Sequence, residues 1–234
     1  MDNCLTCPDD QWPNEERIAC LPKALEFLSY DDPMGAILAS VSVCLFGIAA
    51  LILGIFIQYR DTAIVKANNR NLSYILLISI MFCFLSSLMF IGPPGKIICL
   101  FQQTSFGIIF SIAISCILAK TVMVVIAFKS KNPGSKWSKW MTSRVSNSIV
   151  LLGSLIQVLI CFAWLIYSPP FQNFNSNSES GKIIIECDEG SIIAFCFVLG
   201  YMGLLAIVNF IVAFLARSLP DSFNEAKFIT FSML

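Results

Sequence analysis

Residues 34–57 read MGAILASVSVCLFGIAALILGIFI, a stretch of 24 residues without a charged side chain. A helix needs about 20 predominantly apolar residues to cross a bilayer. Four further apolar stretches follow along the chain, at residues 72–91, 97–128, 149–167 and 192–216. Backbone polar groups in hydrocarbon must be satisfied within their own segment, and none of the stretches alternates as a barrel strand would. We therefore expect an all-α fold, a polytopic bundle of transmembrane helices.

The composition agrees with a membrane protein and argues against several other classes. Hydrophobic residues make up 57% of the chain and charged residues 13%, whereas soluble domains average about 25% charged residues. The formal net charge is zero, so no basic field points to nucleic acid. The chain has no histidine, the commonest general base and metal ligand. We expect no catalytic residue, no metal and no cofactor.

The charged residues of the connecting segments predict the orientation. Segments after the first, third and fifth stretches hold ten basic and three acidic residues, while the other segments hold four basic and twelve acidic residues. Short loops rich in Lys and Arg stay in the cytoplasm, so we expect an extracellular N-terminus. The ten basic residues are Arg60, Lys66, Arg70, Lys129, Lys131, Lys136, Lys139, Arg144, Arg217 and Lys227.

The last residues begin a sixth apolar stretch. Residues 228–234 are apolar enough to open a spanning helix but too few to complete one. We expect a sixth helix to start near residue 226 and the chain to be incomplete.

The cysteines divide by location. Cys99 and Cys187 both lie on the outer, oxidising side, so they could form a disulfide or remain two free thiols. Cys4, Cys7 and Cys20 form an odd set in the outer N-terminal segment, which implies a free thiol or an absent partner. The cysteines inside the apolar stretches are interpreted as small apolar residues.

Two features near the cytoplasmic side have alternative interpretations. Lys120 is the one charged residue clearly inside a spanning stretch. It either marks a functional site, with Glu225 or Asp221 as partner, or snorkels to the interface. The loop at residues 129–147 has five basic and no acidic residues, which fits anionic lipid, a docked cytoplasmic partner, or both.

Glycines within the stretches predict close contacts between helices, because a glycine lets two backbones approach. They are Gly47, Gly54, Gly153, Gly200 and Gly203. The glycosylation sequon at residues 71–73 is interpreted as a false match, because it lies on the cytoplasmic side.

Several motifs resemble class C (family 3) G-protein-coupled receptors. Residues 59–70, YRDTAIVKANNR, resemble the first intracellular loop of that family, and residues 217–228, RSLPDSFNEAKF, resemble the third. The residues LAKT at 118–121 resemble the cytoplasmic end of helix three. Within the class, FLSY at 27–30, QTSFGIIF at 103–110 and SPPF at 168–171 are most similar to vomeronasal type-2 (pheromone-type) receptors.

The resemblance implies an organisation into two parts and a set of partners. Residues 1–31 would be the tail of an extracellular cysteine-rich domain and a linker, and residues 32–234 an incomplete seven-transmembrane domain. The expected location is the plasma membrane, and the expected partners are a heterotrimeric G protein, a receptor dimer partner and membrane lipid. The ligand domain, most of helix six and helix seven are absent from this sequence, so we expect no signalling by this chain alone.

The resemblance also assigns roles to individual residues. Cys99 would bond Cys187, Cys7 would bond Cys20, and Cys4 would pair with an upstream cysteine. Lys120 and Glu225 would form a salt bridge that joins helices three and six in the resting receptor. The G-protein-facing loop residues would be Lys129, Lys131, Lys136, Lys139, Arg144, Arg217 and Lys227.

Other interpretations remain open at this point. Calcium-sensing and fish olfactory receptors share much of the same pattern. A transporter or channel subunit would instead predict polar or charged residues near helix centres and internal repeats. A membrane enzyme would need a catalytic or metal-binding cluster, which the pattern lacks.

Overall fold

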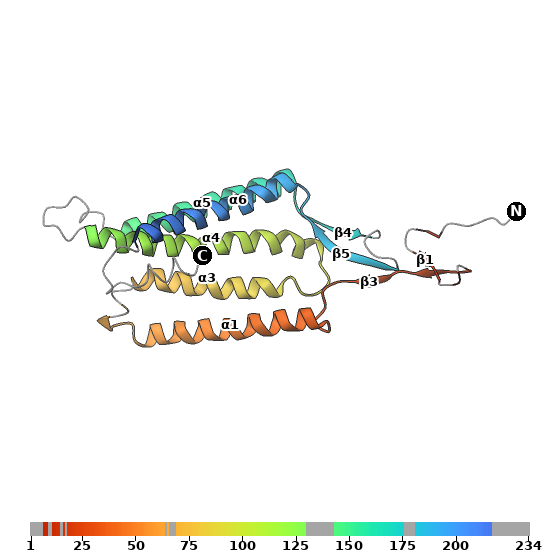
Figure 1. Ribbon diagram of the computed structural model, residues 1–234, viewed down its shortest axis with the longest axis horizontal. Helices are drawn as coiled ribbons and strands as arrows, with labels where there is room; N and C mark the ends of the chain where they lie inside the picture. The colour runs from red at the N-terminus through yellow and green to blue at the C-terminus, as the bar shows by residue number, and fades with distance from the viewer. Residues whose placement is uncertain are drawn as a thin grey trace.

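Five long helices dominate the described part of the chain (Figure 1). The computed structural model describes residues 7–8, 11–14, 16, 18–63, 65, 69–129, 143–175 and 181–216. Within these residues all five helices are long and apolar enough to cross a membrane. They are α1 (Pro33–Gln58), α3 (Arg70–Leu88), α4 (Lys96–Lys129), α5 (Ser143–Tyr167) and α6 (Ile192–Ala216).

The helices contain the expected apolar stretches but differ from them at their ends. Helix α5 begins at Ser143, six residues before the apolar stretch, because a helix can continue into water where polar side chains are tolerated. Helix α3 ends at Leu88, three residues before the stretch does. There the chain turns through Gly92, whose φ of 112° favours glycine, and two prolines follow.

Helix α4 lies at the centre of the bundle. It packs against α3 on one side and against α5 and α6 on the other, while α1 packs against α3 at the edge (Figure 1). One small core, formed by Leu72, Cys116, Ala119 and Val150, joins α3, α4 and α5. A second core around Trp164 and Val198 joins α5 to α6.

Polar and small side chains lie inside the bundle, and large apolar side chains face outward. Leu51, Leu151 and Phe197 expose 70%, 67% and 67% of their surface. Two of the buried hydroxyls bond to their own helices: Ser79 donates to the Ile75 carbonyl at 2.7 Å and Thr121 to the Ile117 carbonyl at 2.9 Å. This distribution suits a lipid environment, where small residues allow close helix packing and apolar residues contact hydrocarbon.

The all-α prediction is wrong, because two small β-sheets extend from one end of the helical bundle (Figure 1). Strands β1 (Gln11–Pro13) and β2 (Cys20–Pro22) form an antiparallel pair. In the second sheet, β5 (Lys182–Asp188) lies between β3 (Ala24–Glu26) and β4 (Phe171–Asn175). The rule that favours helices applies only in hydrocarbon. Outside it, a run such as Ile183-Ile184-Ile185 favours a strand, because β-branched side chains pack well on a sheet.

Both sheets belong to the outer segments defined by the charge pattern. The end of the bundle that carries them is therefore the outer end, and the opposite end is the inner end (Figure 1). The inner end includes the first residues of α3 and α5 and the last residues of α1, α4 and α6.

Candidate functional site

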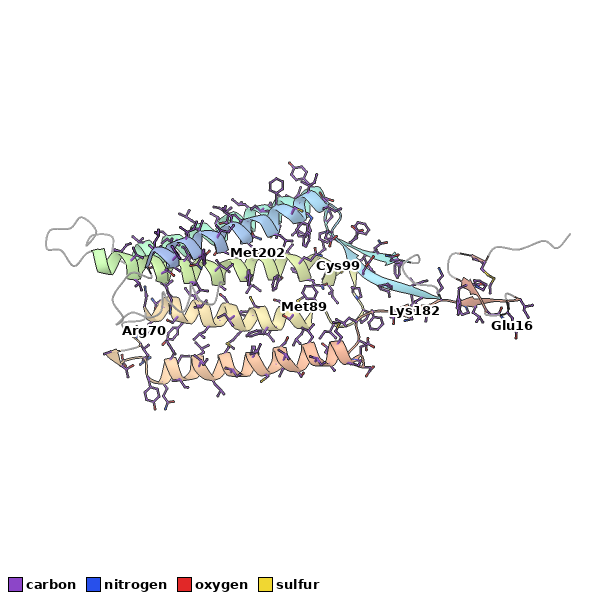
Figure 2. All side chains as sticks on the ribbon, in the orientation of Figure 1. Glu16, Arg70, Met89, Cys99, Lys182 and Met202 are labelled. Carbon is purple, nitrogen blue, oxygen red and sulfur yellow. A yellow bond between two sulfur atoms is a disulfide. The ribbon has the colours of Figure 1, made fainter. Side chains whose placement is uncertain are left out.

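The outer end of α4 is covalently joined to the three-stranded sheet. Cys99, in the first turn of α4, forms a disulfide with Cys187 of β5, and their Cα atoms are 5.4 Å apart. Cys99 is fully buried. Gln102, one turn further along α4, places its Oε1 atom 3.5 Å from the Cys187 sulfur, which as a disulfide has no proton to donate. Figure 2 shows Cys99 at the junction between helix and sheet.

The same sheet incorporates residues 23–32, the segment between β2 and α1, which is called the linker below. Strand β3 pairs in parallel with β5, with Ala24 opposite Lys182 and Glu26 opposite Ile184. The Lys182 ammonium donates to Glu26 Oε1 at 2.9 Å, with 44% and 47% of the two side chains exposed. Such an exposed ion pair contributes at most about 1 kcal/mol of stability. The backbone pairing of β3 with β5 therefore provides most of the attachment between the linker and the sheet. The linker therefore reaches α4 through β5 and the disulfide.

A second contact ties the linker to the first outer loop. The Gly92 amide donates to the Leu28 carbonyl at 2.7 Å. Gly35 in α1 lies so close to the Ser29 carbonyl that a Cβ atom would have no space there. The linker is thus held by β5, by the loop after α3 and by the first turn of α1.

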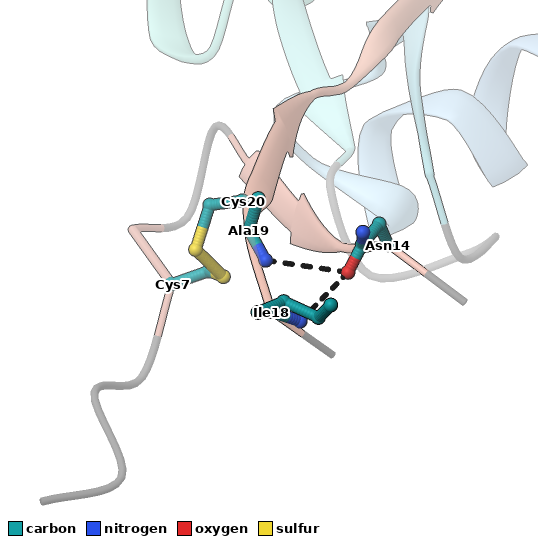
Figure 3. Close-up of a disulfide and its surroundings, with 5 residues drawn as sticks. All are labelled: Cys7, Asn14, Ile18, Ala19 and Cys20. Carbon is teal, nitrogen blue, oxygen red and sulfur yellow. Dashed lines mark hydrogen bonds between the residues drawn. A yellow bond between two sulfur atoms is a disulfide. The ribbon is translucent and has the colours of Figure 1, made fainter. Parts of the chain in front are cut away.

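The N-terminal strand pair has its own disulfide (Figure 3). Cys7 is bonded to Cys20, with Cα atoms 5.8 Å apart. Asn14 Oδ1 accepts hydrogen bonds from the Ile18 and Ala19 amides at 2.9 and 3.3 Å, which closes the turn between β1 and β2. Cys4 lies outside the described residues.

Polar contacts join α4, α5 and α6 within the membrane-spanning region. Gln157 of α5 donates to the Val198 carbonyl of α6 at 3.5 Å, and it lies close to Gly107 of α4. Tyr201 of α6 donates to the Gly153 carbonyl of α5 at 2.9 Å. These bonds between helices have backbone carbonyls as acceptors, so they depend on the spacing of the helices themselves.

Asn209 adds a contact between α6 and α4 nearer the inner end. Its amide donates to the Ile114 carbonyl at 3.4 Å. Asn209 and Gln157 are both fully buried, and within the described chain Asn209 Oδ1 and Gln157 Oε1 have no hydrogen-bond partner. Neither residue was predicted from the sequence, where only the charge of Lys120 marked a functional position inside a spanning stretch. Uncharged polar residues in the same stretches were the available signal.

Of the predicted salt bridge between Lys120 and Glu225, only Lys120 lies among the described residues. Lys120 lies in α4 on its inner half and is partly buried. Glu225 lies outside the described residues. Lys129 is the last residue of α4 and Arg144 the second of α5. The other residues predicted to face the G protein lie outside the described residues: Lys131, Lys136, Lys139, Arg217 and Lys227.

Close packing occurs at one of the five predicted glycines. A Cβ atom at Gly153 would collide with the Ser115 side chain of α4. At the other four, no described atom outside the adjacent backbone of the same helix lies within 4 Å of the Cβ position: Gly47, Gly54, Gly200 and Gly203.

Five apolar helices with α4 at the centre, and an outer sheet disulfide-bonded to α4, define a polytopic helical membrane protein. Residues 28–234 match a family model described as the 7 transmembrane sweet-taste receptor of 3 GCPR. The chain therefore belongs to this family, the class C G-protein-coupled receptors, and is a multi-pass protein of the plasma membrane. The family is one of receptors and not of enzymes.

Individual relatives agree with this assignment. The chain is 57% identical to mouse vomeronasal type-2 receptor 26 over 234 residues, which is 100% of this chain and 27% of that protein. It is 48% identical to mouse vomeronasal type-2 receptor 116, over 100% of this chain and 27% of that protein. It is 47% identical to the human extracellular calcium-sensing receptor over 248 residues, 99% of this chain and 23% of that protein. The chain thus spans about a quarter of the length of these relatives.

Proposed function

We propose that this chain forms the transmembrane signalling part of a chemosensory, pheromone-type class C receptor that acts through a heterotrimeric G protein. The observation that carries the proposal is the continuous connection at the outer end. Strand β3 of the linker pairs with β5, and β5 is disulfide-bonded to α4, the helix that contacts α3, α5 and α6. A displacement of the linker would therefore reach the centre of the bundle through bonded elements. The likeness to vomeronasal type-2 receptors supports the pheromone type.

At the inner end, we infer that Lys120 of α4 forms an ion pair with Glu225 in the resting receptor. Lys120 is the charged residue that the sequence places inside a spanning stretch, and an intramembrane charge is costly unless it has a function or a partner. Separation of the pair would open a G-protein site bordered by Lys129 and Arg144. The full receptor would act as a dimer in a lipid membrane, with its ligand bound by a domain upstream of this chain. The proposed role is not enzymatic.

A chimeric receptor tests the proposed function. The human calcium-sensing receptor would carry this chain's 234 residues in place of its matching segment, and extracellular Ca²⁺ would serve as the agonist. We expect Ca²⁺-dependent G-protein activation, measured as nucleotide exchange in membranes, at surface expression equal to the parent receptor. Full surface expression without any Ca²⁺ response would contradict the proposal.

The ion pair is tested in the same chimera. Lys120→Glu is expected to raise agonist-independent nucleotide exchange several-fold, because two nearby carboxylates would repel. Adding Glu225→Lys should restore the low basal rate by recreating the pair with reversed charges. A double variant whose basal rate equals the sum of the two single effects would rule out a direct pair.

A further inference from the structure

A groove opens between α3 and α5, with α4 at its floor. Its volume is about 540 Å³, within the range of small-molecule sites. Tyr74 and Ile75 of α3 form one wall, Val150 and Leu151 of α5 form the other, and Ile112 of α4 contributes to the floor. Leu151 is 67% exposed and Ile75 38% exposed, so the groove is open rather than enclosed.

The polar groups of the groove are concentrated at its inner end. Asn71 is the second residue of α3 and Asn147 the fifth of α5, and both helices begin at the inner membrane surface. Neither side-chain amide makes a hydrogen bond to any described residue, and both residues are exposed. The other two polar groups already have partners, because Tyr74 donates to the Phe56 carbonyl and Ser154 to the Val150 carbonyl.

The lining has no charged side chain among the described residues. The described lining residues therefore offer an anionic phospholipid headgroup no ion pair. The apolar walls run for about 10 Å along α5, the rise of the seven residues from Asn147 to Ser154. A neutral lipid with one hydroxyl group at the membrane surface and a stiff apolar body matches this arrangement.

We propose that the groove binds a membrane sterol from the inner leaflet. Its hydroxyl would bond to the Asn71 and Asn147 amides, and its fused rings would lie against Ile75, Ile112 and Leu151. A rigid ring system loses little conformational freedom on binding, whereas a phospholipid acyl chain would lose more. The site also gives Asn71 a role as a hydrogen-bond partner of the sterol. Asn71 belongs to the glycosylation sequon that was interpreted as a false match, because it lies on the cytoplasmic side. This inference does not depend on the signalling proposal.

Photolabelling of the purified 234-residue chain in phosphatidylcholine vesicles tests the site. The probe is a cholesterol analogue that carries a diazirine on the ring system and an alkyne tag. We expect label on peptides containing residues 71–75 or 147–154, and competition by excess unlabelled cholesterol. Phosphatidylserine at the same mole fraction should not compete. Label confined to other helices, or equal competition by phosphatidylserine, would overturn the proposal.

Two variants with a matched control sharpen the test. Leu151→Trp fills the groove and is expected to lower specific labelling about tenfold, the effect of roughly 1.4 kcal/mol. Leu159→Trp makes the same change on α5 at a residue that is 57% exposed and does not line the groove, and it should label as the unmodified chain does. Equal losses in both variants would contradict the site.

Asn147→Leu gives an independent readout if the tryptophan variant folds poorly. This variant should label roughly fivefold less, and it should lose the preference for cholesterol over 5-cholestene, which lacks the hydroxyl group. Helical content by circular dichroism and an intact Cys99–Cys187 bond would establish that each variant is folded. An unchanged preference for the hydroxyl in a folded Asn147→Leu chain would overturn the assignment of the amides.

Discussion

Cys187→Ser is expected to abolish agonist-stimulated G-protein activation in the chimeric receptor and to lower the free energy of unfolding by about 2–5 kcal/mol. The bond closes a loop between residues 88 positions apart, so its loss frees much of the unfolded chain. It would also detach β5 from α4 while leaving β3 paired with β5. The agonist response at equal surface expression and the thermal midpoint of the purified protein measure the two effects.

Cys196→Ser is the matched control for this prediction. Cys196 is a free, exposed cysteine on α6, so the same chemical change removes no bond there. We expect the agonist response and the thermal midpoint to remain those of the unmodified protein. If both serine variants behave alike, or if Cys187→Ser leaves both measurements unchanged, the disulfide does not connect the sheet functionally to α4.

Gly153→Leu is expected to lower the free energy of unfolding by about 1–3 kcal/mol and to separate α5 from α4. A Cβ atom at this position collides with Ser115, which is fully buried and has little space to move. The shift would also displace the Gly153 carbonyl that accepts the Tyr201 hydrogen bond. Thermal unfolding of the purified protein in detergent measures the loss.

Gly203→Leu separates this packing effect from the helix propensity of leucine. Both substitutions gain the same intrinsic propensity, close to 1 kcal/mol, but no described atom outside the adjacent backbone of α6 lies within 4 Å of the Gly203 Cβ position. The Gly203 variant should therefore be at least as stable as the unmodified protein. For the smaller change Gly153→Ala, a second substitution, Ser115→Gly, should recover stability by removing the colliding side chain. Failure of that rescue would show that the contact with Ser115 is not the cause.

The helical part of the fold was predictable because one physical requirement dominates it. In hydrocarbon, each spanning segment must satisfy its own backbone, so apolar length alone predicts a helix. The ends were less predictable. Helix α5 begins at the polar residues Ser143 and Arg144. Hydropathy does not distinguish a helix that continues past the membrane surface from a loop that begins there, because both are polar.

The sheets could not be predicted by the same reasoning. The pairing of Ala24 with Lys182 joins residues 158 positions apart, and no local pattern specifies such a partner. The run Ile183-Ile184-Ile185 was a usable signal for β5, but the rule for membrane segments does not extend to the loops between them. The all-α fold class was therefore wrong, because the outer segments form sheets, although the five spanning stretches are helical.

The candidate site was predictable where chemistry restricts the partners. Cys99 and Cys187 lie on the same oxidising side in the sequence, and the structure joins them. Gln157 and Asn209 were missed because an uncharged amide in an apolar stretch changes the mean hydropathy little. Only the structure reveals that both are fully buried between α4, α5 and α6.

The length of α4 has a mechanical consequence. Its 34 residues extend for about 51 Å, well beyond the hydrocarbon thickness of about 30 Å. The helix is held covalently at Cys99, close to its outer end, so it can act as a lever with its pivot at the disulfide. A tilt of about 5° around that pivot would move the far end of a helix of this length by roughly 4 Å. A small rotation of α4 at the disulfide would therefore displace its inner end by several ångströms.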